Sequence, residues 1–225
     1  MSARATGRAA ALEAIRASGL IPIIRARSSE SAARAAETLV EAGIGVVEIT
    51  MTVPGALEVI RDVAARLGGR ALVGAGTVTE AATARAAIEA GARFLVTPGL
   101  CLDVLEVARA EDVASIPGVL TPTEILAALR AGADLLKIFP VAPVGGPAYL
   151  RALRGPFPDA PLVPTGGVAL ESIPDYFAAG AFAVGVGGEL VSRAALEQGD
   201  FSALAALAAR YTAAVEAGRR GAGRP

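Results

Sequence analysis

Apolar and polar positions alternate in blocks along almost the whole chain. Short runs rich in Val, Ile and Leu predict strands, and each is followed by a segment rich in Ala, Leu, Glu and Arg with helical period. Eight such runs occur: Leu20–Ala26, Gly45–Met51, Ala71–Val78, Phe94–Leu100, Ala114–Leu120, Leu135–Val141, Pro161–Val168 and Ala181–Gly188. Helical segments repeatedly end in a phrase such as EAGA, whose glycine suits the left-handed turn after a helix: Gly43, Gly91, Gly132 and Gly180. The chain therefore reads as repeated strand–helix units.

The repeat predicts the fold class. Near-continuous apolar strands joined through helices indicate a parallel sheet that is covered on both faces. Eight strand–helix units in 225 residues fit an α/β fold, the closed (β/α)8 TIM barrel. The alternative is an open doubly wound sheet, which usually carries a GxGxxG turn after its first strand. The first run is followed instead by Arg25-Ala26-Arg27-Ser28-Ser29, so the pattern favours the barrel.

The two ends of the chain differ from the repeating body. An amphipathic stretch from Ala9 to Ala17 predicts a helix that caps the barrel ahead of the first strand. The segment from Gly218 onward has no apolar periodicity and predicts a loose end. We therefore expect a single barrel domain over residues 1–217 and a flexible C-terminal tail over residues 218–225.

Composition excludes several classes of protein. Apolar residues make up 53% of the chain and charged residues 19%, which excludes disorder for its body. A net charge of −1 argues against a nucleic-acid surface, and no stretch reaches the ~20 apolar residues that span a bilayer. The Arg- and Ala-rich start lacks the apolar core of a signal peptide; a transit peptide is the alternative to a first helix. The single Cys forms no internal disulfide, and we expect a cytoplasmic protein.

The absence of histidine narrows the chemistry most. It excludes Ser-His-Asp and Cys-His catalysis and every metal site that needs imidazole, and a lone Cys offers little to zinc. Acid–base catalysis must then be carried out by Glu, Asp, Lys, Tyr or the substrate itself. We expect a mechanism that needs no metal ion.

Two charged residues lie inside predicted strands. Lys137 stands in the run LLKIFP, and Glu48 stands in VVEITM. A lysine is almost never buried without a partner or a function. Burial lowers the pKa of a lysine and leaves a fraction of neutral amine, which can attack a carbonyl, while a nearby carboxylate moves protons. The alternative is a buried Lys–Glu ion pair with no catalytic role, and the residue pattern favours catalysis.

Small and polar residues end the other predicted strands, where the functional groups of a barrel gather. Two adjacent glycine pairs predict an anion site that is built from backbone N–H groups, the alternative being tight packing: Gly166 and Gly167 after the seventh strand, Gly187 and Gly188 after the eighth. Arg25 ends the first strand, and Thr77, Thr97 and Thr165 are hydroxyl donors at later strand ends, although such threonines are more often helix caps. Cys101, just after the fourth strand, has no His partner and is expected to be a buried or incidental thiol.

The motifs together resemble one family. VVEITMTVPGA, VGAGTV, TPGL, PGVLTPTE, LLKIFP and VPTGGV, in this order between about Ile15 and Leu190, resemble the 2-keto-3-deoxy-6-phosphogluconate (KDPG) aldolase family, also described as 4-hydroxy-2-oxoglutarate (KHG) aldolase. The resemblance implies a homotrimeric TIM barrel that cleaves a small 2-keto-4-hydroxy acid to pyruvate and an aldehyde through a Schiff base. The resemblance also places this cleavage reaction in the Entner–Doudoroff pathway of carbohydrate metabolism.

The resemblance also implies roles for single residues. Lys137 forms the Schiff base, and Glu48 is the general acid–base. Thr77, Thr165 and Pro98 match positions that bind substrate, and the glycines at 166, 167, 187 and 188 match the phosphate-binding loops. The chain departs from some members at Thr52, where they carry an Arg, and at Gly188, where they carry a Ser. We expect Arg25 to bind the anion in place of the missing Arg.

Three alternatives stay open. A galactonate-type phosphate aldolase would use the same Schiff base on the opposite C4 stereochemistry. A phosphate-binding barrel isomerase or synthase would have no use for a lysine inside a strand. A non-catalytic oligomeric phosphate-binding barrel is the third, and an intact Glu48 and Lys137 argue against it. The sequence predicts no nucleic-acid or membrane partner.

Overall fold

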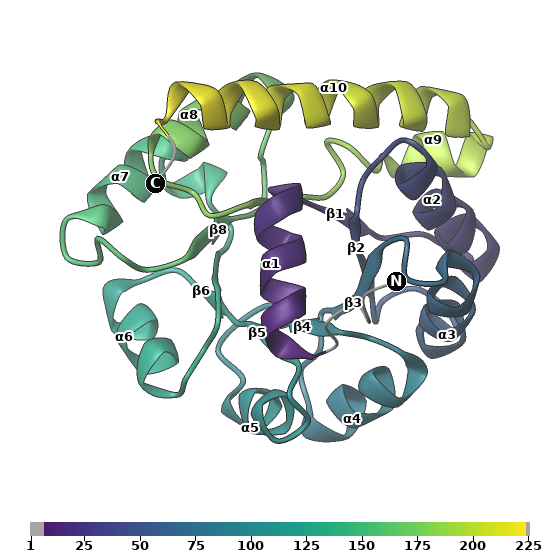
Figure 1. The fold of residues 1–225 in the computed structure, drawn as a ribbon, viewed down its shortest axis with the longest axis horizontal. Coiled ribbons are helices and arrows are strands. Elements are labelled where there is room, and N and C mark those ends of the chain that lie inside the picture. Colours follow the sequence, from purple (N-terminus) through teal and green to yellow (C-terminus); the bar gives the residue numbers. More distant parts are fainter. Residues whose placement is uncertain (1–6, 224–225) are drawn as a thin grey trace, which may run out of the picture.

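The computed structural model describes residues 7–223 and shows an α/β fold with a curled parallel sheet inside a layer of helices (Figure 1). All eight apolar runs contain strand. The strands are β1 Leu20–Ile24, β2 Val46–Thr50, β3 Leu72–Gly76, β4 Phe94–Val96, β5 Ala114–Ile116, β6 Gly118–Val119, β7 Leu136–Ile138, β8 Leu162–Pro164 and β9 Val184–Val186. The predicted parallel α/β sheet is therefore confirmed.

The strands are paired in two sheets. Six strands follow the order β5-β4-β3-β2-β1-β9, and three follow the order β6-β7-β8. The fifth apolar run divides at Pro117, which has no N–H to donate to a ladder, so that β5 pairs with β4 and β6 pairs with β7. A single parallel bridge between Thr165 and Gly185 links the other ends of the two sheets.

Helices cover the outer face of the sheets. They are α1 Arg8–Ser18, α2 Ser29–Glu41, α3 Ala56–Leu67, α4 Ala81–Ala90, α5 Leu102–Ala110, α6 Pro122–Arg130, α7 Pro147–Arg154, α8 Ile173–Ala178, α9 Arg193–Gln198 and α10 Phe201–Gly221, with short 3-10 turns at Ala142–Val144 and Leu170–Ser172. Figure 1 shows α2 to α10 around the strands and α1 across their middle. Within residues 7–223, no helix combines the length and the apolar character that crossing a membrane requires.

The first helix closes one end of the interior, as expected. Ala11 and Ile15 of α1 are buried in one apolar cluster with inward-facing strand residues such as Val46 and Phe94. Asp134, just ahead of β7, pairs with Arg8 of α1 and accepts a hydrogen bond of 2.9 Å from the Ser115 backbone N–H. The N-terminal ends of the strands are therefore sealed, and the opposite end is left for function.

The C-terminal helix is longer than the sequence predicted. It continues to Gly221, four residues into the segment that was predicted as a tail from Gly218. Gly218 is buried on α8, where a side chain would meet Phe177 and Pro174. The Arg219 guanidinium donates a hydrogen bond of 2.8 Å to the carbonyl of Ala17 at the end of α1. These contacts hold the last turn of α10, so the helix does not end at the predicted boundary, residue 217. Residues 224 and 225 lie outside the described range.

Candidate active site

The two charged residues of the strands meet inside the fold. Glu48 lies level with Ile23 of β1 and Gly74 of β3, and Lys137 lies level with Gly118 of β6 and Val163 of β8. Both residues are 2% exposed. Strand alternation turns both side chains inward, where they line one small cavity. The sequence prediction that they share an interior is confirmed.

Lys137 carries the electrostatics of a nucleophilic amine. Its burial lowers the pKa of the ammonium below the ordinary 10.5, because the charged form loses its hydration. The negative charge of Glu48 works against that shift, while the positive charge of Arg25 adds to it. The Nζ atom lies 4.8 Å from the centre of the Phe139 ring. A fraction of neutral amine is therefore available at a lower pH than for a lysine in water.

Glu48 is tuned in the opposite direction. Complete burial raises the pKa of its carboxyl above the ordinary 4.5, and the charges of Lys137 and Arg25 only partly oppose that shift. Its Oε1 atom is buried and has no hydrogen-bond partner. A buried carboxylate oxygen without a partner is costly, so its presence points to a function. A group of this kind can accept a proton from a bound substrate and return it.

The geometry does not support the alternative, a structural ion pair between Glu48 and Lys137. Among residues 7–223, the salt bridges within 4.0 Å do not include one between Glu48 and Lys137. A buried pair is held together by close contact and by hydrogen bonds to the remaining polar atoms, and Glu48 Oε1 makes none. The amine and the carboxylate stand apart in one cavity, as a nucleophile and a proton carrier would.

The cavity between them is small. Its volume is about 10 Å³, and its walls come from seven of the nine strands: Ile21, Ile23, Glu48, Val96, Ile116, Lys137, Val163, Thr165 and Gly185. A space of this size holds about one water molecule. An organic substrate must therefore reach Lys137 from the carboxyl-terminal ends of the strands, where the predicted binding residues lie.

Arg25 and Thr77 meet at this end. The Arg25 Nη1 atom lies 3.3 Å from the Thr77 hydroxyl oxygen, to which it donates a hydrogen bond. Thr77 has φ of 59°, which a β-branched residue rarely adopts and which marks strain near a functional site. Arg25 is also close enough to shift the pKa of both Glu48 and Lys137. The structure thus brings the predicted anion-binding Arg beside the predicted amine and carboxyl.

The other residues predicted at the strand ends are Thr97, Pro98 and Thr165, and the structure places them differently. Thr165 is buried beside Gly185 on the wall of the cavity, with its hydroxyl directed to the Val163 carbonyl at 3.2 Å. Pro98 is exposed at the rim. Thr97 is buried, and its hydroxyl accepts a hydrogen bond from the Gly118 N–H at 3.2 Å and donates one to the carbonyl of Gly99 in the following turn. Thr97 is therefore satisfied by backbone, and Thr165 is the threonine that lines the cavity.

The glycine pairs are not equivalent. Gly166 and Gly167 have φ of 88° and 77°, and a side chain on them would meet Phe139 and Ala142. The left-handed backbone and the close packing both favour glycine at these two positions. A side chain at Gly187 or Gly188 would meet nothing within 4 Å, so packing does not account for glycine there. Open space above bare backbone suits an anion that approaches the N–H groups.

Two features of the site go beyond the sequence prediction, which placed Phe139 on the same strand face as Lys137 without a role. Phe139 packs on the amine of Lys137, and its signal was its position two residues along the same strand face. The second is a count: Lys137 is the single lysine of the chain, against 20 arginines. The only primary amine on a side chain is therefore the one buried in this cavity.

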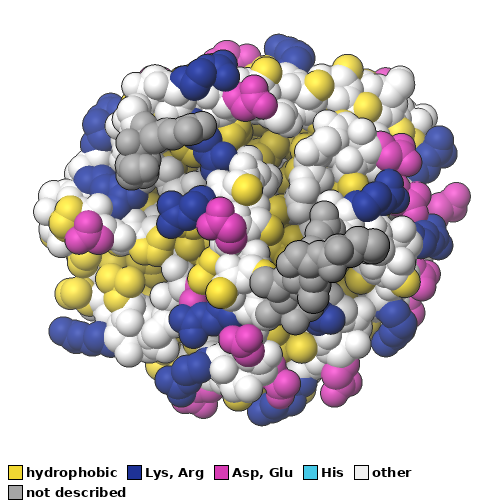
Figure 2. Space-filling model, viewed as in Figure 1, with side chains coloured by type: hydrophobic (Ala, Val, Ile, Leu, Met, Phe, Trp, Pro, Cys, Tyr) yellow, Lys and Arg dark blue, Asp and Glu magenta, His cyan; other side chains and the backbone are white. Residues whose placement is uncertain are grey.

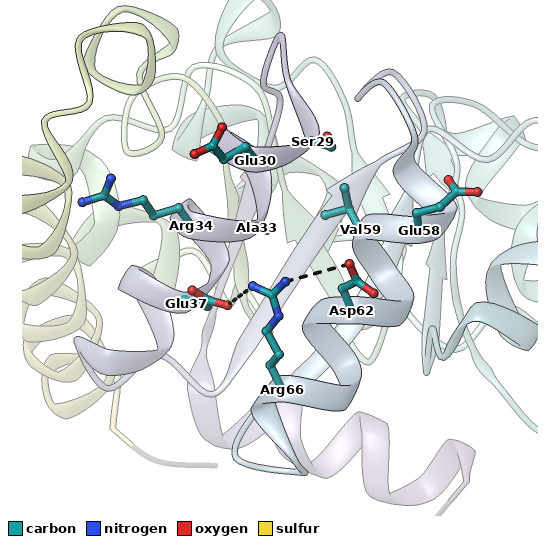
Figure 3. A pocket seen from close by; sticks show the side chains of 9 residues that line it. All are labelled: Ser29, Glu30, Ala33, Arg34, Glu37, Glu58, Val59, Asp62 and Arg66. Carbon is teal, nitrogen blue, oxygen red and sulfur yellow. Dashed lines mark hydrogen bonds and ion pairs between the residues drawn. The ribbon is translucent and has the colours of Figure 1, made fainter.

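A second hollow lies on the surface, away from the strand cavity. It measures about 470 Å³ between α2 and α3, and none of the predicted site residues lines it (Figure 3). Arg66 crosses it to Glu37 at 3.0 Å and Asp62 at 3.9 Å; Arg66 and Asp62 are exposed, and Glu37 is half-buried. This hollow holds no lysine and no buried charged side chain. The strand cavity is therefore the candidate active site, because a buried amine and a buried carboxyl group line it.

Comparison with known proteins agrees with this placement. The family model for KDPG and KHG aldolases matches residues 12–207. A 2-dehydro-3-deoxy-phosphogluconate aldolase of Dickeya dadantii is 35% identical over 88% of this chain and 92% of its own length. A KHG/KDPG aldolase of Escherichia coli K12 is 34% identical over 84% of this chain and 88% of its own.

Solved structures are similar as well. A KDPG aldolase of Legionella pneumophila, with pyruvate captured as a covalent carbinolamine intermediate, superimposes with a TM-score of 0.82 at 30% identity and covers 88% of this chain and 96% of its own. A structure named native KDPGal gives 0.81 at 31% identity, covering 89% and 96%. A tryptophan synthase of M. tuberculosis, at 21% identity and 0.69, shares the fold alone. With the family match over most of its length, the chain belongs to the KDPG and KHG aldolase family and is an aldolase, a lyase that breaks carbon–carbon bonds.

Proposed function

We propose that the protein is a Schiff-base aldolase that cleaves 2-dehydro-3-deoxy-6-phosphogluconate to pyruvate and glyceraldehyde 3-phosphate, and also 4-hydroxy-2-oxoglutarate to pyruvate and glyoxylate. One observation carries the proposal. The only lysine of the chain is buried without an ion pair, in a cavity that it shares with a buried and unpartnered carboxylate. The names of its relatives support the two substrates.

The reaction uses these two groups in turn. The neutral amine of Lys137 attacks the C2 carbonyl of the keto acid, and loss of water from the carbinolamine gives an iminium. The C4 hydroxyl gives its proton to Glu48, the C3–C4 bond breaks, and its electron pair passes into the iminium to form an enamine. The aldehyde leaves. The enamine then takes a proton at C3, and water releases pyruvate and the free amine. No cofactor takes part in these steps.

The remaining residues bind the two ends of the substrate. Arg25 pairs with the carboxylate of the pyruvyl part, which Thr77, Pro98 and Thr165 line at the carboxyl ends of β3, β4 and β8. The phosphate at the far end rests on the backbone of the glycine loops after β8 and β9, where Gly187 and Gly188 leave open space. The exposed Thr52 brings no positive charge to this site, so Arg25 is the cation that acts on the substrate.

The same proposal covers the finer architecture. We propose that the two sheets close into one (β/α)8 barrel domain, because Thr165 and Gly185 bridge β8 to β9 and only Pro117 separates β5 from β6. We propose a homotrimer, since Leu102, Leu126, Leu129 and Val144 are exposed. Figure 2 shows hydrophobic side chains gathered over α6 on the left of this face. The bacterial metabolic relatives favour a cytoplasmic place.

A second substrate has one observation in its favour. The chain is 31% identical to the structure named KDPGal, much as it is to the KDPG aldolases. Both C4 epimers, of the gluconate and the galactonate type, belong in the assay. We expect the gluconate epimer to give the higher kcat/KM.

Trapping with borohydride tests the function. Pyruvate and borohydride should inactivate the protein and add one pyruvate-derived group per chain, because reduction converts the imine to a stable secondary amine. Mass spectrometry of peptides should place the group on Lys137. Lys137→Arg keeps the charge but cannot form the imine, so it should lose labelling and turnover together. The N-terminal amine is the only other primary amine, and the Arg variant measures its background. A parent protein without label on Lys137 would overturn the proposal.

A further inference from the structure

Gly76, at the carboxyl end of β3, lies directly under the carboxyl group of Glu48. Glu48 is level with Gly74 on the neighbouring strand, and Thr50 is level with Gly76. The Glu48 side chain therefore leans along its strand toward the open end, over the bare Cα of Gly76. A Cβ added at Gly76 would have Oε1, Cδ and Cγ of Glu48 as its three nearest heavy atoms, all inside van der Waals contact.

The backbone does not demand glycine at this position. The φ angle of Gly76 lies outside the left-handed region, so an L side chain is compatible with the strand there. The atoms that stand in the way of a side chain belong to one residue, Glu48. The glycine is therefore needed for the space that this carboxyl group occupies.

The carboxyl group has few other places to lie. The ring of Phe94 covers the Cα of Gly74, so the interior one step below is filled. Glu48 is completely buried, which excludes an escape to solvent. The remaining space is the cavity on the interior side, which Lys137 also lines. A methyl group on Gly76, which points inward by strand alternation, would push the carboxyl group that way.

We propose that Gly76 is a positioning residue, whose missing side chain holds the Glu48 carboxyl group in a recess beside β3 and apart from the Lys137 amine. The recess explains how a buried acid and a buried amine share a cavity without an ion pair. It keeps the amine free to attack the carbonyl and leaves Oε1 free to take the proton of the C4 hydroxyl. This inference rests on the roles proposed above for Lys137 and Glu48.

Gly76→Ala tests the recess. We expect kcat to fall by about 10²-fold, the typical cost of misplacing a catalytic group by about an ångström. Pyruvate should still be trapped on Lys137, but more slowly at neutral pH, because a carboxylate closer to the amine stabilises the ammonium. The pH profile of trapping should therefore move to higher pH. A fold-only role for Gly76 would lower the melting temperature without moving this profile.

A double-mutant cycle shows whether the effect passes through Glu48. Glu48→Asp is shorter by one methylene and relieves the clash, so its additional cost in Gly76→Ala should be much smaller than its cost in the parent chain. Gly45→Ala is the matched control, because its added methyl meets nothing within 4 Å and its φ is not left-handed; its activity should equal that of the parent. If Gly76→Ala does not fold, Glu48→Asp should restore a folded protein.

Each outcome decides the inference. Additive losses in the cycle, full activity in Gly76→Ala, or an unfolded double variant would overturn it. Failure of the proposed function is distinct, because it would show as a parent protein that pyruvate and borohydride do not label at Lys137.

Discussion

The charges of Lys137 and Glu48 are held in the interior at a cost to stability. The raised pKa of Glu48 means that the folded state binds its proton more tightly than the unfolded chain does, so its burial costs more as the pH rises above 4.5. The lowered pKa of Lys137 has the opposite sign, and its cost is present at every pH below the ordinary 10.5 and fades as the pH approaches it. Near neutral pH the fold therefore carries both costs.

Removing either charge should stabilise the fold at pH 7. We expect Lys137→Met and Glu48→Gln each to raise the free energy of unfolding by about 1–3 kcal/mol, since well-packed neutral side chains replace poorly compensated buried charges. For a chain of this size, that is a rise in Tm of several degrees. Both variants lose activity, so thermal unfolding is the measurement. A marked loss of stability in both would support a structural ion pair instead.

The pH dependence of trapping separates the neighbours of Lys137 by sign. The charge of Glu48 raises the pKa of Lys137 and the charge of Arg25 lowers it. Glu48→Gln should therefore move the midpoint of the trapping rate to lower pH, and Arg25→Gln should move it to higher pH. Reductive trapping of pyruvate with cyanoborohydride across a pH series measures both shifts. Shifts of the same sign would show that these charges do not act on the amine.

The sequence predicts a functional role for single residues where a charged residue interrupts an apolar run. A lysine and a glutamate inside apolar runs are conspicuous, and strand alternation alone turns them inward. The space beneath Glu48 was not predicted, because Gly76 reads like any glycine at a strand end, and only the path of the Glu48 side chain shows its purpose. The strained backbone of Thr77 was missed for the same reason, since φ is set by the turn and not by the residue type.

At the scale of elements, periodicity predicted every strand and overlooked one interruption. The apolar pattern predicts one strand over residues 114–120, but Pro117 divides this run between two sheets. The last helix exceeded its prediction because its final turn rests on Phe177 and on the end of α1, contacts far away in sequence. Local pattern predicts the middle of an element well, and tertiary contacts decide its ends.

The proposed phosphate site in the loop after β9 can be tested with two variants that differ only in charge. Gly188→Asp places a carboxylate in the open space proposed for the phosphate, and Gly188→Asn places a neutral side chain of the same shape there. We expect the Asp variant to raise the KM for the phosphorylated substrate by about tenfold or more over the Asn variant, because like charges repel at close range. The unphosphorylated 4-hydroxy-2-oxoglutarate should distinguish the two variants much less. Equal effects on both substrates would place the phosphate elsewhere.

At the scale of the whole molecule, the hydrophobic pattern predicts contacts within one chain but not contacts between chains. Periodicity reports which face of a helix meets its own sheet, and it does not report which face meets another copy. The exposed side chains of Leu126 and Leu129 on α6, 42% and 37% accessible, are apolar surface that the fold itself does not cover. Large apolar patches on a soluble chain mark interfaces, so these residues locate the proposed subunit contact.

A charge in that patch should separate the proposed trimer. Leu126→Glu places a carboxylate where a partner would exclude water, and burying an unpaired charge costs several kcal/mol. Light scattering at micromolar concentration should give about three chains of 22.5 kDa for the parent and a smaller particle for the variant. Arg61→Glu, an exposed substitution on α3, is the matched control and should leave the mass unchanged. A parent that scatters as a single chain would refute the trimer and leave the cavity of Lys137 and Glu48, which lies within one chain, as the complete catalytic unit.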